Sequence, residues 1–177
     1  EFDCGVFSLT VIDLTFYDQD EEETEDPTIM AGLTNGSIEI IVKSSPRFRL
    51  TGHNEMVTCL RTIQGEDHRF GLISASRDGT ARLWSVDIDS ETYTCQHVFR
   101  APGSFPLYVV SVLRTFEFDS SGYAIPNCKV ITGGRDGAFN WYDLRSGRFE
   151  RKSEAHSKCV FQLIRDEIDD EMYVCGV

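Results

Sequence analysis

The sequence predicts an all-β fold built from repeated antiparallel hairpins, and three stretches of the chain predict it. The clearest is GLISASRDGTARLWSVD, Gly71–Asp87, where apolar and small residues alternate on both sides of Arg77-Asp78-Gly79. A related stretch, KVITGGRDGAFNWYDLRSG, follows at Lys129–Gly147, and a weaker one, IMAGLTNGSIEIIVKS, precedes at Ile29–Ser44. Period-two alternation is typical of strands, and a triplet ending in glycine suits a tight hairpin loop. The chain therefore reads as a series of similar β units.

The residues that recur at matching positions define this unit. Asp136-Gly137 and Asn35-Gly36 repeat the turn Asp78-Gly79, Thr132 repeats Ser74, and Tyr142 and Ile41 repeat Trp84. With a three-residue loop at Arg77-Asp78-Gly79, Ser74 and Trp84 fall on the same face of their hairpin.

The combination of Gly52-His53, Ser74, Asp78-Gly79 and Trp84 resembles the WD repeat. Repeats of ~40–45 residues, each forming one four-stranded blade of a β-propeller, characterise that family. The resemblance implies an all-β propeller segment of about three and a half four-stranded antiparallel blades. The approximate blades are residues 5–50, 51–100, 101–153 and 154–177, the last one incomplete. It further implies a protein-binding scaffold that is not an enzyme and uses no cofactor.

The first unit begins with an inner strand within Gly5–Phe16, where the alternation changes phase between Val11 and Ile12 and suggests a bulge. Asp18–Asp26 is an acidic run, typical of a solvated loop. The remaining strands expected in this unit are Thr28–Leu33, Ser37–Lys43 and Arg47–Leu50.

In the second unit we expect Met56–Ile63 and Thr94–Phe99 to flank the central hairpin. The third unit adds an inner strand at Tyr108–Phe118, a polar loop at Asp119–Asn127 and an outer strand at Phe149–Lys152. In the fourth, Ala155-His156 replaces Gly-His, Cys159–Ile164 is strand-like and Asp166–Glu171 is an acidic loop. The chain lacks an initiator Met and stops before the next Asp-Gly turn is due, so we expect a segment of a longer propeller.

Antiparallel connectivity places the loops on two opposite rims. The loop after the first strand of each unit shares a rim with the loop after the third strand, so both acidic runs should lie on one rim. Arg77 and Arg135 precede the turn aspartates and should lie on the other rim. An arginine fork suits carboxylates and phosphates, so these two residues are candidate contacts for acidic or phosphorylated peptides, with solvated rim cations as the alternative.

His53, Ser74 and Asp78 have the composition of a hydrolase triad, but a triad needs an exposed nucleophile and an oxyanion site. With Trp84, these residues match the family's structural tetrad, and the resemblance implies a hydrogen-bond chain Asp78–His53–Ser74–Trp84. Thr132, Asp136 and Tyr142 form a partial second tetrad whose histidine position, near Pro106, holds no histidine. The four histidines show no metal-ligand spacing with Cys or carboxylates.

Tyr142-Asp143-Leu144-Arg145 resembles the W-D-x-R box of WD-repeat receptors in cullin-RING ubiquitin ligases. The resemblance implies that Asp143 and Arg145 contact the ligase adaptor. The alternative is that Asp143 ends its strand and Arg145 is a solvated loop cation.

Charge and composition limit the partners. The formal net charge of −12 argues against non-specific nucleic-acid binding, and the sequence has no apolar run long enough for a membrane helix. Six dispersed cysteines without a Cys-x-x-Cys pair favour reduced thiols in the cytoplasm or nucleus. The sequence thus predicts an intracellular scaffold or adaptor that binds other proteins. A ubiquitin-ligase substrate receptor is one alternative, and an RNA-processing or ribosome-assembly factor is another.

Overall fold

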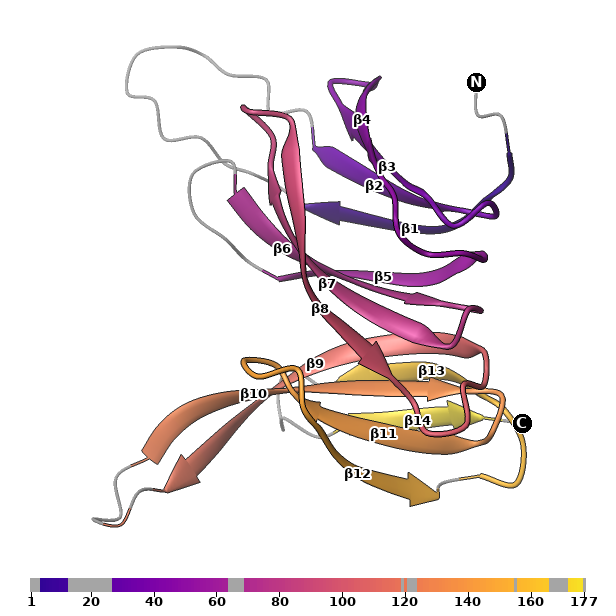
Figure 1. Cartoon of the computed structure of the whole chain (residues 1–177), viewed down its shortest axis with the longest axis vertical. Helices are drawn as coiled ribbons and strands as arrows, with labels where there is room; N and C mark the ends of the chain where they lie inside the picture. The colour runs from indigo at the N-terminus through magenta and orange to yellow at the C-terminus, as the bar shows by residue number, and fades with distance from the viewer. Residues whose placement is uncertain are drawn as a thin grey trace.

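The computed structural model describes residues 4–12, 27–63, 69–118, 120, 124–154, 156–165 and 172–176. These residues form fourteen strands in four antiparallel sheets, in which each strand pairs with its neighbours in chain order. Figure 1 shows the sheets following one another from the N-terminal to the C-terminal part of the chain.

Three of the sheets have four strands each. The first contains β1 (Val6–Ile12), β2 (Thr28–Leu33), β3 (Ile38–Val42) and β4 (Ser45–Leu50). The second contains β5 (Val57–Ile63), β6 (Arg69–Ser76), β7 (Thr80–Asp87) and β8 (Thr92–Arg100). The third contains β9 (Leu107–Phe118), β10 (Ala124–Gly134), β11 (Ala138–Asp143) and β12 (Phe149–Glu154). The two-stranded sheet of β13 (Val160–Arg165) and β14 (Met172–Gly176) follows, so the expected blade architecture is confirmed.

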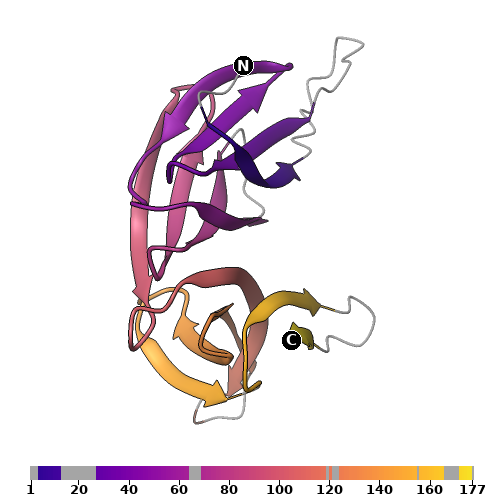
Figure 2. The same ribbon diagram turned by 90° about the vertical axis from the view of Figure 1, so that its right-hand side faces the viewer.

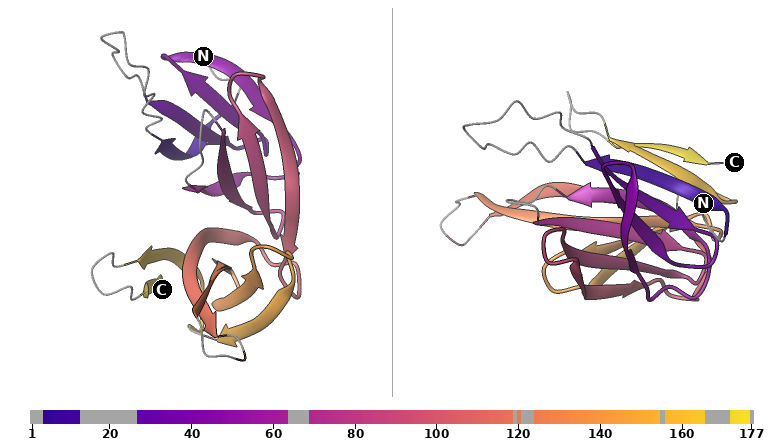
Figure 3. Two further views of the ribbon diagram at one scale, coloured as in Figure 1. Left: turned by 90° about the vertical axis from the view of Figure 1, so that its left-hand side faces the viewer. Right: turned by 90° about the horizontal axis from the view of Figure 1, so that it is seen from above.

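The sheets are arranged in an arc, with β8 and β12 on its outer side and β9 and β13 on its inner side (Figures 2 and 3). Apolar side chains fill the spaces between them, because neighbouring sheets bury the faces that they turn toward each other. One core joins the first two sheets and includes Met30, Ile40, Leu60, Leu72 and Trp84. A second core continues from the second sheet to β13 and includes Ile73, Phe99, Val110, Tyr142 and Val160.

The turns β2–β3, β6–β7 and β10–β11, together with the β8–β9 connection, form one rim that we name the turn rim. The β6–β7 and β10–β11 turns and the β8–β9 connection lie together at the right of Figure 1. The same backbone hydrogen bond recurs there in three sheets. In each of these sheets, the backbone N–H of the residue after the second strand donates to the carbonyl of the residue before the first strand, at 2.9–3.0 Å. The donor and acceptor pairs are Thr34 and Gly5, Arg77 and Met56, and Arg135 and Pro106.

Two sequence expectations are wrong in detail. The bulge of β1 lies between Val6 and Ser8, not at Val11 and Ile12, and β5 and β13 have the same irregularity at their first residues. The loop expected over Asp119–Asn127 becomes strand from Ala124, because β10 continues along β9 beyond the end of β11. Pro126 is tolerated there because that part of β10 has only one strand neighbour. The two acidic runs, Asp18–Asp26 and Asp166–Glu171, lie outside the described residues.

Candidate functional site

A chain of hydrogen bonds links the turn rim to the core of the second sheet. The Trp84 indole N–H donates to Ser74 Oγ at 2.9 Å, and Ser74 Oγ lies 2.7 Å from His53 Nε2. His53 Nδ1 lies 3.0 Å from Asp78 Oδ2. Because a carboxylate can only accept, His53 Nδ1 donates to Asp78, while Nε2 shares a hydrogen bond with the Ser74 hydroxyl. The structure therefore brings together all four residues that the sequence singled out for this unit.

Asp78 holds the tip of the turn as well as the histidine. Its carboxylate accepts hydrogen bonds from the backbone N–H of Asn54 at 3.1 Å and from the N–H and hydroxyl of Thr80 at 2.9 and 2.7 Å. Burial alone would raise the pKa of Asp78. The bonds from His53, Thr80 and Asn54, with the attraction of His53, outweigh burial and hold that pKa well below its usual value. Asp78 is therefore a structural anion with no spare lone pairs for catalysis.

The corresponding cluster of the third sheet is organised differently. Thr132, Asn140 and Tyr142 are buried, but among the described residues the hydroxyls of Thr132 and Tyr142 have no hydrogen-bond partner of good geometry. Burial, assisted by the charge of Asp136, outweighs the opposing effect of the nearby Thr132 hydroxyl and raises the pKa of Tyr142 to about 12. Asp136 is paired with Lys152 of β12, whose Nζ lies 2.8 Å from Oδ2. Lys152 of the outer strand thus pairs with Asp136, as His53 pairs with Asp78 in the second sheet.

Contacts of the turn glycines show which residue of the third unit takes the position that His53 has in the second. A Cβ added at Gly36 would lie 2.6 Å from the His53 carbonyl oxygen, and one added at Gly79 would lie 3.0 Å from the Ser104 carbonyl oxygen. Ser104 therefore takes the position of His53 before the third sheet, two residues earlier than the expected Pro106. Its side chain is exposed rather than turned into the sheet.

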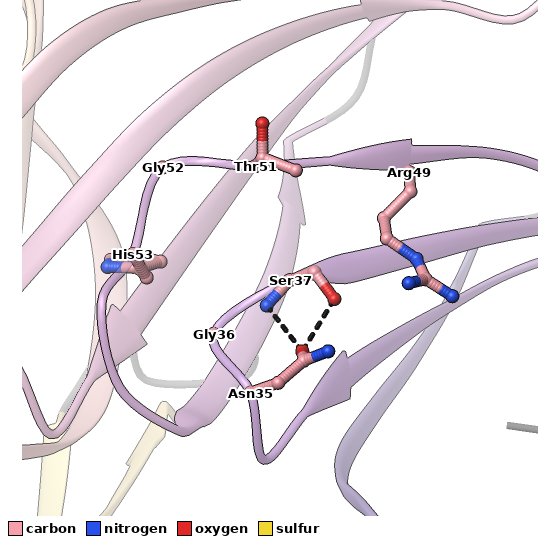
Figure 4. Close-up of a pocket in the computed structure, with 7 residues that line it drawn as sticks. All are labelled: Asn35, Gly36, Ser37, Arg49, Thr51, Gly52 and His53. Atoms are coloured by element: carbon pink, nitrogen blue, oxygen red, sulfur yellow. Dashed lines mark hydrogen bonds between the residues drawn. The ribbon is translucent and has the colours of Figure 1, made fainter. Parts of the chain in front are cut away.

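A shallow polar pocket lies beside His53, where the first sheet meets the second (Figure 4). Asn35 Oδ1 accepts two hydrogen bonds from Ser37 at 3.0 and 2.7 Å, and this closes the β2–β3 turn. Arg49, at the edge of the pocket, forms an ion pair of 2.7 Å with the buried carboxylate of Glu39. Asn35 and Ser37 thus bond to each other, whereas Arg49 and Thr51 bond to residues outside the pocket, Glu39 and Tyr93.

Arg77 and Arg135 are both exposed on the turn rim, in the β6–β7 and β10–β11 turns. Within the part of the chain that the structure describes, neither guanidinium forms an ion pair or a hydrogen bond. The neighbouring aspartates Asp78 and Asp136 are occupied by His53 and Lys152. The two arginines are therefore available to a partner.

Asp143 ends β11 and Arg145 lies in the β11–β12 turn, on the opposite rim. Asp143 Oδ1 accepts hydrogen bonds from the N–H and hydroxyl of Ser146 at 2.8 and 2.6 Å, and these bonds hold the pKa of Asp143 below its usual value. His97 of β8 contacts the same turn, with Nε2 2.9 Å from the Arg145 carbonyl oxygen. Asp143 thus shapes the turn, while the Arg145 side chain is exposed.

Sequence reasoning missed three residues at these sites, namely Lys152, His97 and Phe105. Lys152 and His97 act across strands, so their partners depend on the sheet register and on the packing of one sheet against the next. Phe105 lies in the β8–β9 connection and is 43% exposed. An aromatic residue in a loop that contains Pro and Gly was the one available signal.

The described residues offer no cluster of metal ligands and no helical membrane span. No group of three or more His, Cys, Asp or Glu side chains there is placed to hold a metal ion. None of those residues forms a helix long and apolar enough to cross a membrane.

Comparison with known proteins relates this geometry to a family. The family model "WD domain, G-beta repeat" matches residues 44–85, which include His53, Ser74, Asp78 and Trp84. The Arabidopsis thaliana protein "DENN domain and WD repeat-containing protein SCD1" is 29% identical over 121 residues, 67% of this chain and 8% of that protein. "Nuclear distribution protein nudF" of Emericella nidulans is 30% identical over 116 residues, 63% of this chain and 22% of that protein. The chain thus spans less than a quarter of the length of these relatives.

Solved structures show the same fold at low sequence identity. The computationally designed Ika4 protein has a TM-score of 0.58 at 16% identity, and the match covers 100% of this chain and 94% of that one. A chain of the Mitotic Checkpoint Complex has a TM-score of 0.59 at 19% identity, covering 84% of this chain and 40% of that one. At these identities the likeness concerns the fold alone.

Proposed function

Because this chain belongs to the WD-repeat family, we propose that it is an interaction scaffold, an adaptor subunit that holds other proteins in the cytoplasm or nucleus. Propellers of this family present loops and turns on rigid sheets, and function resides in the surface rather than in the fold. The observation that carries the proposal is the pair Arg77 and Arg135, which recur at the same position of two neighbouring turns.

The chemistry of this pair favours an acidic partner. Both guanidinium groups are exposed and, among the described residues, unpaired, although the whole chain carries 29 acidic residues and a net charge of −12. An arginine fork binds a carboxylate through two parallel hydrogen bonds, which adds direction to the charge attraction. The partner surface proposed for the turn rim is therefore an acidic or phosphorylated segment.

The spacing of the sheets sets the size of that segment. Packed sheets lie ~10 Å apart, so equivalent turns on neighbouring sheets are separated by about 10 Å or more. An extended chain advances ~3.3 Å per residue, so roughly 4–6 residues span both arginines.

The experiment compares two charge reversals of equal size. Arg77→Glu/Arg135→Glu alters the turn rim, and Arg114→Glu/Arg148→Glu alters two exposed arginines away from that rim, in β9 and directly before β12. Quantitative pull-downs from cell extract should lose acidic partners with the first variant and retain them with the second. Retention of every partner by the first variant, with a folded protein by thermal melting, would refute this assignment.

A second candidate function, a ubiquitin-ligase receptor, is supported by the turn that presents Arg145. Asp143 closes this turn from within and His97 contacts it from the neighbouring sheet, so Arg145 is exposed on a fixed backbone. Arg145→Ala should then abolish co-purification of a cullin-RING adaptor while other partners persist. Unchanged adaptor recovery would exclude this function.

A further inference from the structure

The β8–β9 connection presents an aromatic ring on the turn rim. Two consecutive residues of this loop, Gly103 and Ser104, have positive φ angles of 90° and 51°. A serine is seldom found in this left-handed region, and such backbone strain is concentrated at binding sites. A Cβ added at Gly103 would lie 2.7 Å from Phe105 Cε2, so the Phe105 ring lies against this glycine, whose φ of 90° disfavours other residues. Phe105 therefore packs on the backbone of its own loop and is still 43% exposed.

The same loop is fixed between the two arginine-bearing turns. On one side, a Cβ added at Gly79 would lie 3.2 Å from the Phe105 carbonyl oxygen, so the β6–β7 turn with Arg77 packs directly against this segment. On the other side, the N–H of Arg135 donates to the carbonyl of Pro106 at 3.0 Å. Phe105 thus lies between the backbones of Arg77 and Arg135.

Two exposed arginines, Arg77 and Arg135, lie in the turns that flank the Phe105 loop. The carboxylates of the two turns, Asp78 and Asp136, are largely buried and paired with His53 and Lys152. Glu55 is an exposed acidic residue of this rim, and its backbone carbonyl accepts a hydrogen bond from the Ser76 hydroxyl next to Arg77. Lys158 lies exposed beyond Arg135, where its carbonyl faces the turn residue Gly137. An exposed apolar ring between two arginine-bearing turns is complementary to an apolar side chain with acidic neighbours.

We propose that Phe105 is the apolar anchor of the turn rim and that the partner is an acidic protein segment with an aromatic residue between carboxylates. The aromatic residue packs on Phe105 while the carboxylates on either side of it bind Arg77 and Arg135. This proposal rests on the proposed function and adds a side-chain requirement to it. Buried aromatic anchors dominate many interfaces, whereas rim charges mainly set orientation and association rate.

The test uses three fluorescein-labelled synthetic peptides as probes. The first is Gly-Glu-Glu-Trp-Glu-Glu-Gly, the second has Ala in place of Trp, and the third has Lys in place of each Glu. Fluorescence anisotropy measures their binding to the purified wild type, to Phe105→Ala and to Arg77→Glu/Arg135→Glu. Phe149→Ala is the matched control, because Phe149 is 38% exposed and lies on the outer strand β12.

We expect the tryptophan peptide to bind wild type at least about tenfold more tightly than the alanine peptide. Phe105→Ala should remove that difference, because the two truncations delete the same contact and their effects should not add. Phe105→Leu should restore part of the affinity, and Phe149→Ala should leave it unchanged. The lysine peptide should not bind.

The experiment gives different results if the Phe105 anchor is wrong and if the binding of acidic partners by the turn rim is wrong. If Phe105→Ala, folded by thermal melting, binds the tryptophan peptide as wild type does, the anchor is overturned. The charged rim survives that result if Arg77→Glu/Arg135→Glu still abolishes binding. If the wild type binds none of the acidic peptides, or binds them equally well after the charge reversal, both proposals are wrong.

Discussion

The indole N–H of Trp84 donates a hydrogen bond to the hydroxyl of Ser74 over 2.9 Å, between two neighbouring strands of one sheet. Both side chains are almost fully buried, at 1% and 0% exposure. Ser74 also contacts His53, so this bond connects the packed interior to the turn that carries Arg77. The stability of the second sheet and the position of the turn rim therefore depend on the same polar chain.

Trp84→Ala should destabilise the protein by ~3–5 kcal/mol, the usual cost of removing a large buried aromatic side chain. Tyr142→Ala, at the equivalent position, should cost less, because the Tyr142 hydroxyl has no well-formed hydrogen bond among the described residues. Urea unfolding of both variants measures the two changes in free energy of unfolding. A larger loss at Tyr142 would mean that the third sheet, not the second, dominates stability.

Ser74→Ala should cost about 1–3 kcal/mol, because it leaves the Trp84 N–H and His53 buried without their partner. Thr132→Val at the equivalent position should change the free energy of unfolding by less than about 0.5 kcal/mol or stabilise the protein, because no good hydrogen bond is lost there. Chemical denaturation of the two variants separates the contribution of hydrogen bonding to stability from that of packing. Equal losses would show that the Thr132 hydroxyl is also bonded in solution.

Asp78→Asn should lower the free energy of unfolding, and the loss should be largest at neutral pH. The pKa of Asp78 is lower in the folded than in the unfolded protein, so its charge stabilises the fold above the unfolded pKa of about 3.9. That contribution is lost as the pH falls through the lower folded pKa. Denaturant unfolding from pH 7 down to pH 2 should show that the difference in free energy of unfolding between wild type and Asp78→Asn becomes smaller below about pH 4. A gap that stays constant with pH would contradict the charged role of Asp78.

Gly79→Ala should disturb both the turn and the loop that presents Phe105. The residue has φ of +79°, and an added Cβ would lie 3.0 Å from the Ser104 carbonyl oxygen. We expect a loss of at least about 1–2 kcal/mol from the backbone conformation alone. Gly5→Ala is the control, because its Cβ would meet only Thr34 at 3.4 Å. Similar melting temperatures for the two variants would refute this packing.

The sequence predicted the repeated hairpins because their turns depend on local residues, such as the Asp78-Gly79 and Asp136-Gly137 pairs. The hydrogen-bonded residues His53, Ser74, Asp78 and Trp84 were also predicted, because their spacing follows the same local repeat. The ion pair between Lys152 and Asp136 had no local signal, because it depends on the register of β11 with β12, which shifts at a bulge between Trp141 and Tyr142. The start of β10 at Ala124 was hidden by the polar residues and Pro126 before Lys129.

Phe105 illustrates the same limit at the proposed binding surface. Its position follows from the loop backbone at Gly103 and Ser104 and from contacts with two turns that are far away in the sequence. Arg77 and Arg135 were recognised because they repeat at the same turn position, whereas an anchor that occurs once leaves no repeat to recognise.

Site-specific photocrosslinking tests the central claim, that partners bind the turn rim, most directly. A benzoylphenylalanine at exposed position 102, in the β8–β9 connection, reports on the turn rim, and one at exposed position 148, beside the β11–β12 turn, reports on the opposite rim. We predict crosslinks to acidic proteins from position 102 that disappear in Arg77→Glu/Arg135→Glu, and none from position 148. Crosslinks to those proteins from position 148 alone would contradict this account.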